Sequence, residues 1–135
     1  MIKTKIMLAL AALTLFGCSV RHTARLTLHY FPVGAETLTA VTSENITKRS
    51  RPCVIESSED AERITTLLDS GAPAQGNKFG DFAVRLRADV ERRDKSKAIY
   101  FMDNDGNVKG APAGLHRLSE DSLKHLVEVI ERRCS

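Results

Sequence analysis

The first 18 residues limit what the rest of this chain can fold into. Lys3 and Lys5 stand near the start, and no charged residue occurs from Ile6 to Phe16. A basic start followed by a short apolar run is typical of an export signal, and the run is too short to span a bilayer as a stable helix. We therefore expect the folded domain to form without residues 1–17.

Leu15-Phe16-Gly17-Cys18 ends this segment with a small residue directly before a cysteine and a leucine three positions upstream. This pattern resembles the lipobox of bacterial lipoproteins. The resemblance implies that the Cys18 thiol receives a diacylglyceryl group, that the chain is cut before Cys18, and that the new amino group is acylated. Ser19 follows, where an aspartate would imply retention at the inner membrane, so the resemblance implies the outer membrane.

Several acyl chains hold a protein stably at a bilayer, so Cys18 would be a durable anchor and membrane lipid the first expected partner. The resemblance covers only residues 1–19 and concerns processing, not activity. The alternative is a plain secretory signal, or a buried apolar helix with an incidental cysteine.

The charge of the mature part gives no reason to expect a nucleic-acid partner. Cleavage removes Lys3 and Lys5 and no acid, so 118 of the 135 residues remain, with 18 basic and 17 acidic side chains. A nearly neutral, mixed surface is not typical of nucleic-acid binding. The length suits one domain with one core, so we divide the chain into a signal (1–17), a lipidated tether (18–23) and a single domain (24–135).

Two cysteines remain if Cys18 carries lipid, namely Cys53 and Cys134. In an oxidising compartment such a pair predicts a disulfide, the alternative being two free, buried thiols. The bond would close a loop of 82 residues, which a chain-entropy argument values at about 4–5 kcal/mol.

The pattern of apolar residues predicts short strands and two amphipathic helices. Alternation or apolar runs indicate strands at 24–30, 36–42, 52–55, 81–91 and 98–102, with a short one starting at Val108. Apolar stripes behind Ser57 and Ser119 indicate helices that those serines cap. We expect an α+β fold: an antiparallel sheet of about four to six short strands with both helices packed on one face.

Two stretches between these elements are expected to be loops. Thr42 to Arg51 is polar and basic, and Gly71 to Gly80 has no periodicity. Along 81–91, alternate residues are expected to form one buried face, namely Phe82, Val84, Leu86, Ala88 and Val90.

No pattern of residues indicates catalysis, a cofactor or a metal site. Asp103, Asp105 and Asn107 alternate as in a calcium loop, but a hairpin turn is the better interpretation because the glycine and glutamate of an EF-hand are missing from their places. The four histidines lack close metal-ligand spacing, and neither G-x-S-x-G nor a Walker loop is present. We therefore predict no catalytic, cofactor-binding or metal-binding residues.

A basic cluster is the candidate binding site for anionic groups; it consists of Arg85, Arg87, Arg92, Arg93, Lys95 and Lys97. It could bind phosphate or carboxylate groups, such as lipid head groups or cell-wall polymer. Asp81, Asp89, Glu91 and Asp94 are interspersed, so we favour a solvated strand face whose charged turn discourages edge pairing.

These observations predict a non-enzymatic envelope lipoprotein, anchored at the bacterial outer membrane by acylated Cys18 and facing the periplasm. Its expected role is to bind a protein or another envelope component. The first alternative is an inhibitor or exclusion factor acting on a foreign hydrolase, phage or plasmid through the exposed loop Gly71–Gly80. The second is a small hydrolase with residues assembled from distant segments.

Overall fold

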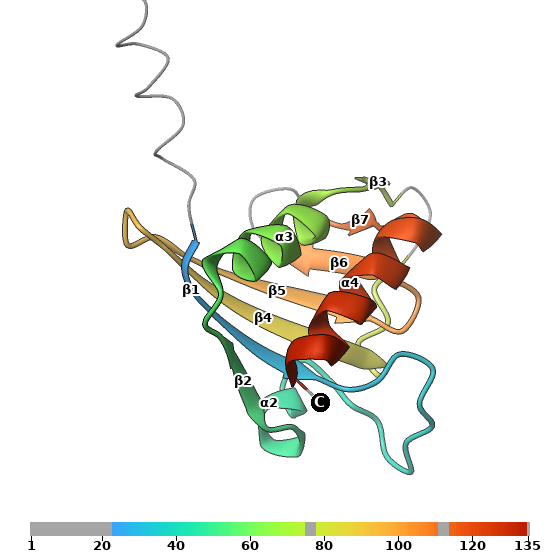
Figure 1. Ribbon diagram of the computed structural model, residues 1–135. Coiled ribbons are helices and arrows are strands. Elements are labelled where there is room, and N and C mark those ends of the chain that lie inside the picture. Colours follow the sequence, from blue (N-terminus) through green and yellow to red (C-terminus); the bar gives the residue numbers. More distant parts are fainter. Residues whose placement is uncertain (1–22, 75–77, 111–113, 135) are drawn as a thin grey trace, which may run out of the picture.

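The computed structural model describes residues 23–74, 78–110 and 114–134, which form a seven-stranded sheet and three helices (Figure 1). The strand order is β2-β1-β4-β5-β6-β7-β3, and every neighbouring pair is antiparallel. The predicted signal and all but the last residue of the predicted tether lie outside the described residues.

The elements have the following bounds. The strands are β1 (Thr23–Tyr30), β2 (Pro52–Ile55), β3 (Ala72–Pro73), β4 (Val84–Arg92), β5 (Lys97–Asp103), β6 (Asn107–Gly110) and β7 (His116–Arg117). The helices are α2 (Ile46–Arg49), α3 (Ser58–Asp69) and α4 (Glu120–Cys134). The predicted α+β fold is confirmed, with more strands than expected because two-residue strands such as β3 and β7 are too short to show a period.

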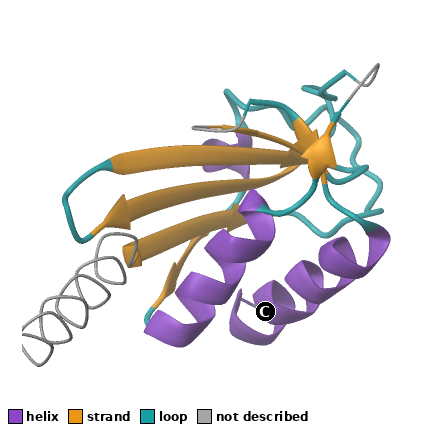
Figure 2. Cartoon of the chain, turned by 90° about the horizontal axis from the view of Figure 1, so that it is seen from above, coloured by secondary structure: helices purple, strands orange, loops and turns teal. Residues whose placement is uncertain are grey.

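The molecule has two layers, with α3 and α4 side by side against one face of the sheet (Figure 2). Alternate residues of β1, β4 and β5 point toward these helices, because successive side chains of a strand lie on opposite faces. They meet the apolar stripes of the two helices in one aliphatic core, whose fully buried members include Leu26, Leu28, Leu86, Met102, Ile64 and Ile130.

Both long helices begin where their serines predict. The Ser57 hydroxyl accepts a hydrogen bond from the Asp60 amide at 3.3 Å, and the Ser119 hydroxyl accepts one from the Ser122 amide at 3.1 Å. These bonds satisfy amides that the first helical turn leaves without a carbonyl partner. No helix of the described part of the chain is long and apolar enough to cross a bilayer.

Two contacts join the start of α3 and the strand before it to the end of α4. The sulfur atoms of Cys53 and Cys134 lie 2.06 Å apart, so the predicted disulfide is present. The Asp60 carboxylate, only 6 % exposed, accepts a hydrogen bond from the Arg133 guanidinium and lies 4.0 Å from that of Arg132. Arg63 is a third cation, 3.9 Å away.

Three local predictions need correction. Residues 36–42 form coil and a bend, with a single bridge at Val41, instead of a strand, so β1 pairs with β2 and β4 and has no hairpin partner directly after it. The polar stretch 42–51 contains the short helix α2, which is held in place by the fully buried side chain of Ile46. The loop predicted at 71–80 contributes β3 to the sheet edge, while its residues 75–77 lie outside the described residues.

The buried face of β4 also starts later than predicted. Phe82 is 74 % exposed, and the strand begins at Val84. An extra residue, Arg85, interrupts the β4–β5 register, because Val84 faces Asp103 while Leu86 faces Met102. This irregularity turns Val84 away from the helices into a second, smaller core with Val41 and Ile46.

Candidate functional site

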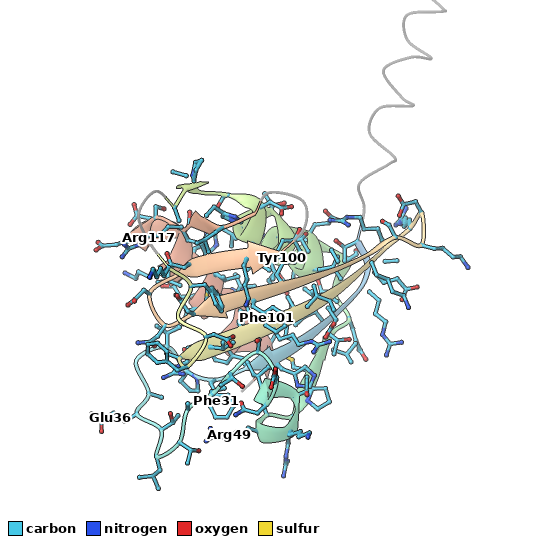
Figure 3. The ribbon with its side chains drawn as sticks, turned by 180° about the vertical axis from the view of Figure 1, so that it is seen from behind. Phe31, Glu36, Arg49, Tyr100, Phe101 and Arg117 are labelled. Atoms are coloured by element: carbon cyan, nitrogen blue, oxygen red, sulfur yellow. A yellow bond between two sulfur atoms is a disulfide. The ribbon has the colours of Figure 1, made fainter. Side chains whose placement is uncertain are left out.

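The face of the sheet opposite α3 and α4, which we call the open face, is the candidate site (Figure 3). Residues 31–49 cover one end of it through the second core, and the rest is left without a helix. Its side chains alternate with those of the aliphatic core and come from four strands: Arg25, Thr27 and His29 of β1, Arg87, Asp89 and Glu91 of β4, Lys97, Ile99 and Phe101 of β5, and Lys109 of β6.

A cluster of three aromatic rings and three cations occupies the covered end of the open face. The Arg49 guanidinium lies 5.7 Å from the ring centre of Phe31, and that of Arg87 lies 5.7 Å from the ring centre of Phe101. The Lys109 ammonium lies 4.3 Å from the Phe79 ring and 5.5 Å from the Phe101 ring. Each distance is within the range of cation–π attraction.

These cations are also held by oxygen atoms. Arg49 donates to the Thr39 and Ala40 carbonyls, both at 2.9 Å, and so fixes the loop before α2. Arg87 donates to both carboxylate oxygens of Asp89, and Lys109 lies 3.8 Å from the Asp81 carboxylate. The cluster therefore stabilises the loop on the sheet as well as presenting charge.

The uncovered end of the open face is a shallow hollow of about 280 Å³. Two cations and two acids line it around Ile99, which is 42 % exposed; they are Arg25, Lys97, Asp89 and Glu91. An exposed apolar side chain surrounded by charges of both signs resembles the centre and rim of a protein-binding patch more than an enclosed ligand pocket. A larger hollow of about 570 Å³ lies between β3 and β7 at the sheet edge, lined by residues 71–74 and 117–119.

The titratable groups whose pKa values shift are not moved toward neutral pH. Burial raises the pKa of Tyr30 to about 12, with the Glu131 carboxylate adding to the effect. Burial and a hydrogen bond to Asp69 likewise raise the pKa of Tyr100 to about 12. The Ser43 hydroxyl lowers the pKa of Asp81. These tyrosines act as hydrogen-bond donors and this aspartate as an acceptor, and none is tuned for acid–base catalysis at pH 7.

The turn that resembled a calcium loop is a hairpin turn between β5 and β6. Asp103 is 2 % exposed, and its carboxylate accepts hydrogen bonds from the Gly80, Asp105 and Asn107 amides and from the Asn107 side chain, each at 2.9 Å. Four donors thus direct this carboxylate inward. Among residues 23–74, 78–110 and 114–134, no three His, Cys, Asp or Glu side chains are grouped as metal ligands.

The structure divides the predicted basic cluster into separate parts. Arg85 is buried, and its guanidinium donates to the Val84 and Ala35 carbonyls, so it is not available as an exposed cation. Arg87 lies on the open face in the cluster with Phe101 and is paired with Asp89. Arg92, Arg93, Lys95 and Lys97 lie at the far end of β4 and the start of β5.

Sequence reasoning missed the three aromatic rings, because Phe31, Phe79 and Phe101 are far apart in the chain and stand in unrelated contexts. Only the pairing of β5 with β6 and the return of two loops bring them together. Cys18, the predicted lipidation site, lies outside the described residues.

The fold and the open face define a class, namely a small disulfide-bonded α+β domain with helices on one side of an antiparallel sheet. No protein family, no curated protein and no solved structure matches the chain.

Proposed function

We propose that the chain is a non-enzymatic lipoprotein of the bacterial outer membrane, anchored through acylated Cys18, whose open face binds a protein partner in the periplasm. The lipobox Leu15–Cys18 carries the first half of the proposal. It is supported by the Cys53–Cys134 disulfide, which suits an oxidising compartment. Only four residues separate Cys18 from β1, so the domain would stay close to the lipid surface.

The exposure of Ile99 on the open face is the observation that supports the proposed binding of a protein partner. Val54, on the neighbouring edge strand β2, is 45 % exposed and adds a second apolar side chain to the side away from the helices. Charges of both signs surround Ile99, and such a surface selects a partner by charge pattern. The sheet thus provides a rigid platform for recognition.

The anchor is tested by the intact mass of the protein extracted from membranes. An N-terminal peptide that begins at Cys18 and carries acyl chains is the expected result. A chain that retains residues 1–17 with an unmodified thiol would refute the anchor.

The binding role is tested by photo-crosslinking in intact cells, with p-benzoylphenylalanine at Ile99. The matched control places the same probe at Glu128, which is exposed on α4. We expect one stoichiometric protein adduct from position 99 and none from position 128. Equal adducts from both positions, or adducts only to lipid, would contradict a binding role for the open face.

A second candidate is an inhibitor or exclusion factor, as the exposed end of the molecule also suggests. Leu38 is fully exposed, and Phe82 is 74 % exposed. Both precede the short bridge between Val41 and Ala83, so they project from the same end of the sheet. The substitution Leu38→Asp should then abolish protection against phage, plasmid or lysozyme without altering the amount of protein. Unchanged sensitivity of a deletion strain would exclude this candidate.

A further inference from the structure

The hairpin between β4 and β5 lies at the end of the sheet where the N-terminal tether enters. β1 begins at Thr23, which pairs with Arg92, the last residue of β4. The tip of the hairpin, Arg93–Lys95, therefore extends just beyond the first described residue (Figure 1). The loop carrying Leu38 follows the opposite end of β1.

The length of the tether limits how far this end can be from the membrane. Four residues lie between Cys18 and Thr23, and even a fully extended chain over those five Cα–Cα steps spans only about 18 Å. If Cys18 is acylated, the hairpin tip is therefore within reach of the head groups of the lipid leaflet that holds the acyl chains.

Cations outnumber acids around this hairpin. The segment Glu91–Lys97, taken together with Arg25, which faces Glu91, contains five cations and two acids. Among the described residues, no ion pair forms with Arg25, Arg93, Lys95 or Lys97.

Of the remaining charged groups, Arg92 approaches the Tyr100 hydroxyl at 3.5 Å. The Asp94 carboxylate accepts hydrogen bonds from the Ser96 hydroxyl and amide, and the hydroxyl is the main cause of its lowered pKa. The other acid, Glu91, and the Glu62 carboxylate that accepts from the Thr23 amide lie behind the tip. The tip itself thus presents unpaired cations.

Lys95 occupies a backbone position that favours glycine. Its φ is +69°, and it is the one non-glycine residue of the described chain in the left-handed region. The Lys95 amide bonds to the Arg92 carbonyl, as in a tight turn followed by a left-handed residue, where glycine would fit without strain. A lysine here keeps a positive charge at the tip despite a conformational cost, which is typical of a functional position.

We propose that the hairpin Arg92–Lys97 contacts anionic phospholipid head groups beside the acylated N-terminus and so fixes the orientation of the domain on the membrane. The inference rests on the proposed lipid anchor. Arg93, Lys95 and Lys97 are complementary to phosphate groups, which arginine binds with two hydrogen bonds and lysine as a point charge. The orientation turns the loop at Leu38 away from the lipid and leaves the open face accessible from the side.

Lysine modification of the full-length acylated protein in vesicles tests this contact. Vesicles of phosphatidylglycerol and phosphatidylethanolamine are compared with vesicles of phosphatidylcholine, and the rate of acetylation of each lysine is measured by mass spectrometry. We expect Lys95 and Lys97 to react several-fold more slowly on the anionic vesicles. Lys48 of α2 is the internal control, because the contact of Ser50 with His29 places that helix near the far end of β1. Its rate should not change.

Two variants and added salt show whether charge causes the protection. Lys95→Gly removes a cation at a position where glycine suits the backbone, so the fold is retained. The acetylation rate of Lys97 on the anionic vesicles should then rise about fivefold. Lys48→Ala is the matched control and should leave Lys97 protected. Raising the salt to 1 M, where the screening length falls to about 3 Å, should abolish the protection.

Equal rates on both kinds of vesicle, or protection that salt does not reduce, would overturn the proposal. The intact mass of the same sample separates this failure from that of the anchor. An acylated protein with an unprotected hairpin contradicts the orientation alone, whereas an unacylated protein contradicts the anchor and, with it, the contact.

Discussion

The two faces of one sheet differ in almost every property, although the same strands supply both. Toward α3 and α4 the strands present aliphatic side chains with almost no exposed surface. Toward the open face they present charges, threonine and the ring of Phe101, with Ile99 exposed among them. Stability therefore depends on one set of alternate residues and recognition on the other. Substitutions one position apart should accordingly differ in their effect on the free energy of unfolding and on partner binding.

The largest effect is expected from the covalent link on the helix side. Replacing Cys53 and Cys134 together by serine should lower the free energy of unfolding by about 4 kcal/mol, because the unfolded chain loses an 82-residue crosslink. Urea denaturation monitored by circular dichroism measures this. A decrease in the free energy of unfolding below about 1 kcal/mol would mean that helix packing keeps the end of α4 in place without the disulfide.

Adjacent core and surface positions test the comparison directly. Leu86→Ala should cost about 3 kcal/mol, because Leu86 is fully buried and a cavity would remain. Ile99→Ala, on the open face of the neighbouring strand, should cost less than about 1 kcal/mol, because much of the side chain is already in water. Similar costs for the two substitutions would show that the open face is covered in solution.

Two aspartates, each paired with arginine, sharpen the comparison. Asp60→Ala should cost about 2 kcal/mol, because the carboxylate is nearly buried and accepts a charge-assisted hydrogen bond from Arg133. Asp89→Ala should cost about 0.5 kcal/mol or less, because its pair with Arg87 is partly in water, with the two side chains 35 % and 26 % exposed. Thermal unfolding of both variants measures the difference, and equal losses would contradict it.

Alkaline pH should lower the free energy of unfolding through two tyrosines, Tyr30 and Tyr100. The pKa values of Tyr30 and Tyr100 are raised to about 12, so the stability they contribute is complete below pH 10, the ordinary pKa of tyrosine. Between pH 10 and 12 the unfolded state loses protons that the folded state keeps, and each tyrosine should reduce stability by about 1.4 kcal/mol per pH unit. Phenolate absorbance and circular dichroism should change together, and a Tyr100→Phe variant should have a shallower slope. Ionisation without unfolding would contradict the expectation.

The smallest effect on stability is expected at Arg87 on the open face. Arg87→Ala should change the free energy of unfolding by about 0.5 kcal/mol or less, since its ion pair with Asp89 is partly solvated. The crosslinking yield from position 99 should nevertheless fall, because Arg87 holds Asp89, one of the two acids beside Ile99. An unchanged yield would remove Arg87 from the binding surface.

The helix side was predictable from the sequence to a large extent. The alternation of Leu26 and Leu28, the stripe behind Ser57 and the stripe behind Ser119 gave strands and helices close to the observed ones, since these patterns follow from local geometry. In α4, Leu126, Val129 and Ile130 are buried, while the neighbouring Val127 is only half-buried. The direction of a stripe depends on the crossing of the two helices, which one segment does not encode.

The open face was much less predictable. Arg85 and Arg87 stand two positions apart, yet the first is buried with its guanidinium on the Ala35 carbonyl, and the second stays partly exposed beside Asp89. The threonine-rich segment 36–42 has strand propensity, but β1 pairs with β2 and β4 instead, so the propensity is overridden by tertiary pairing.

The sequence by itself determined the α+β class, the helix caps, the partnership of Cys53 with Cys134 and the hairpin turn at Asp103–Asn107, because each depends on neighbouring residues or on a count. Only the tertiary structure decided that Phe31, Phe79 and Phe101 meet three cations, and that the β4–β5 hairpin lies beside the entry of the tether. These features depend on strand order and register, which are set by the packing of the whole sheet on two helices.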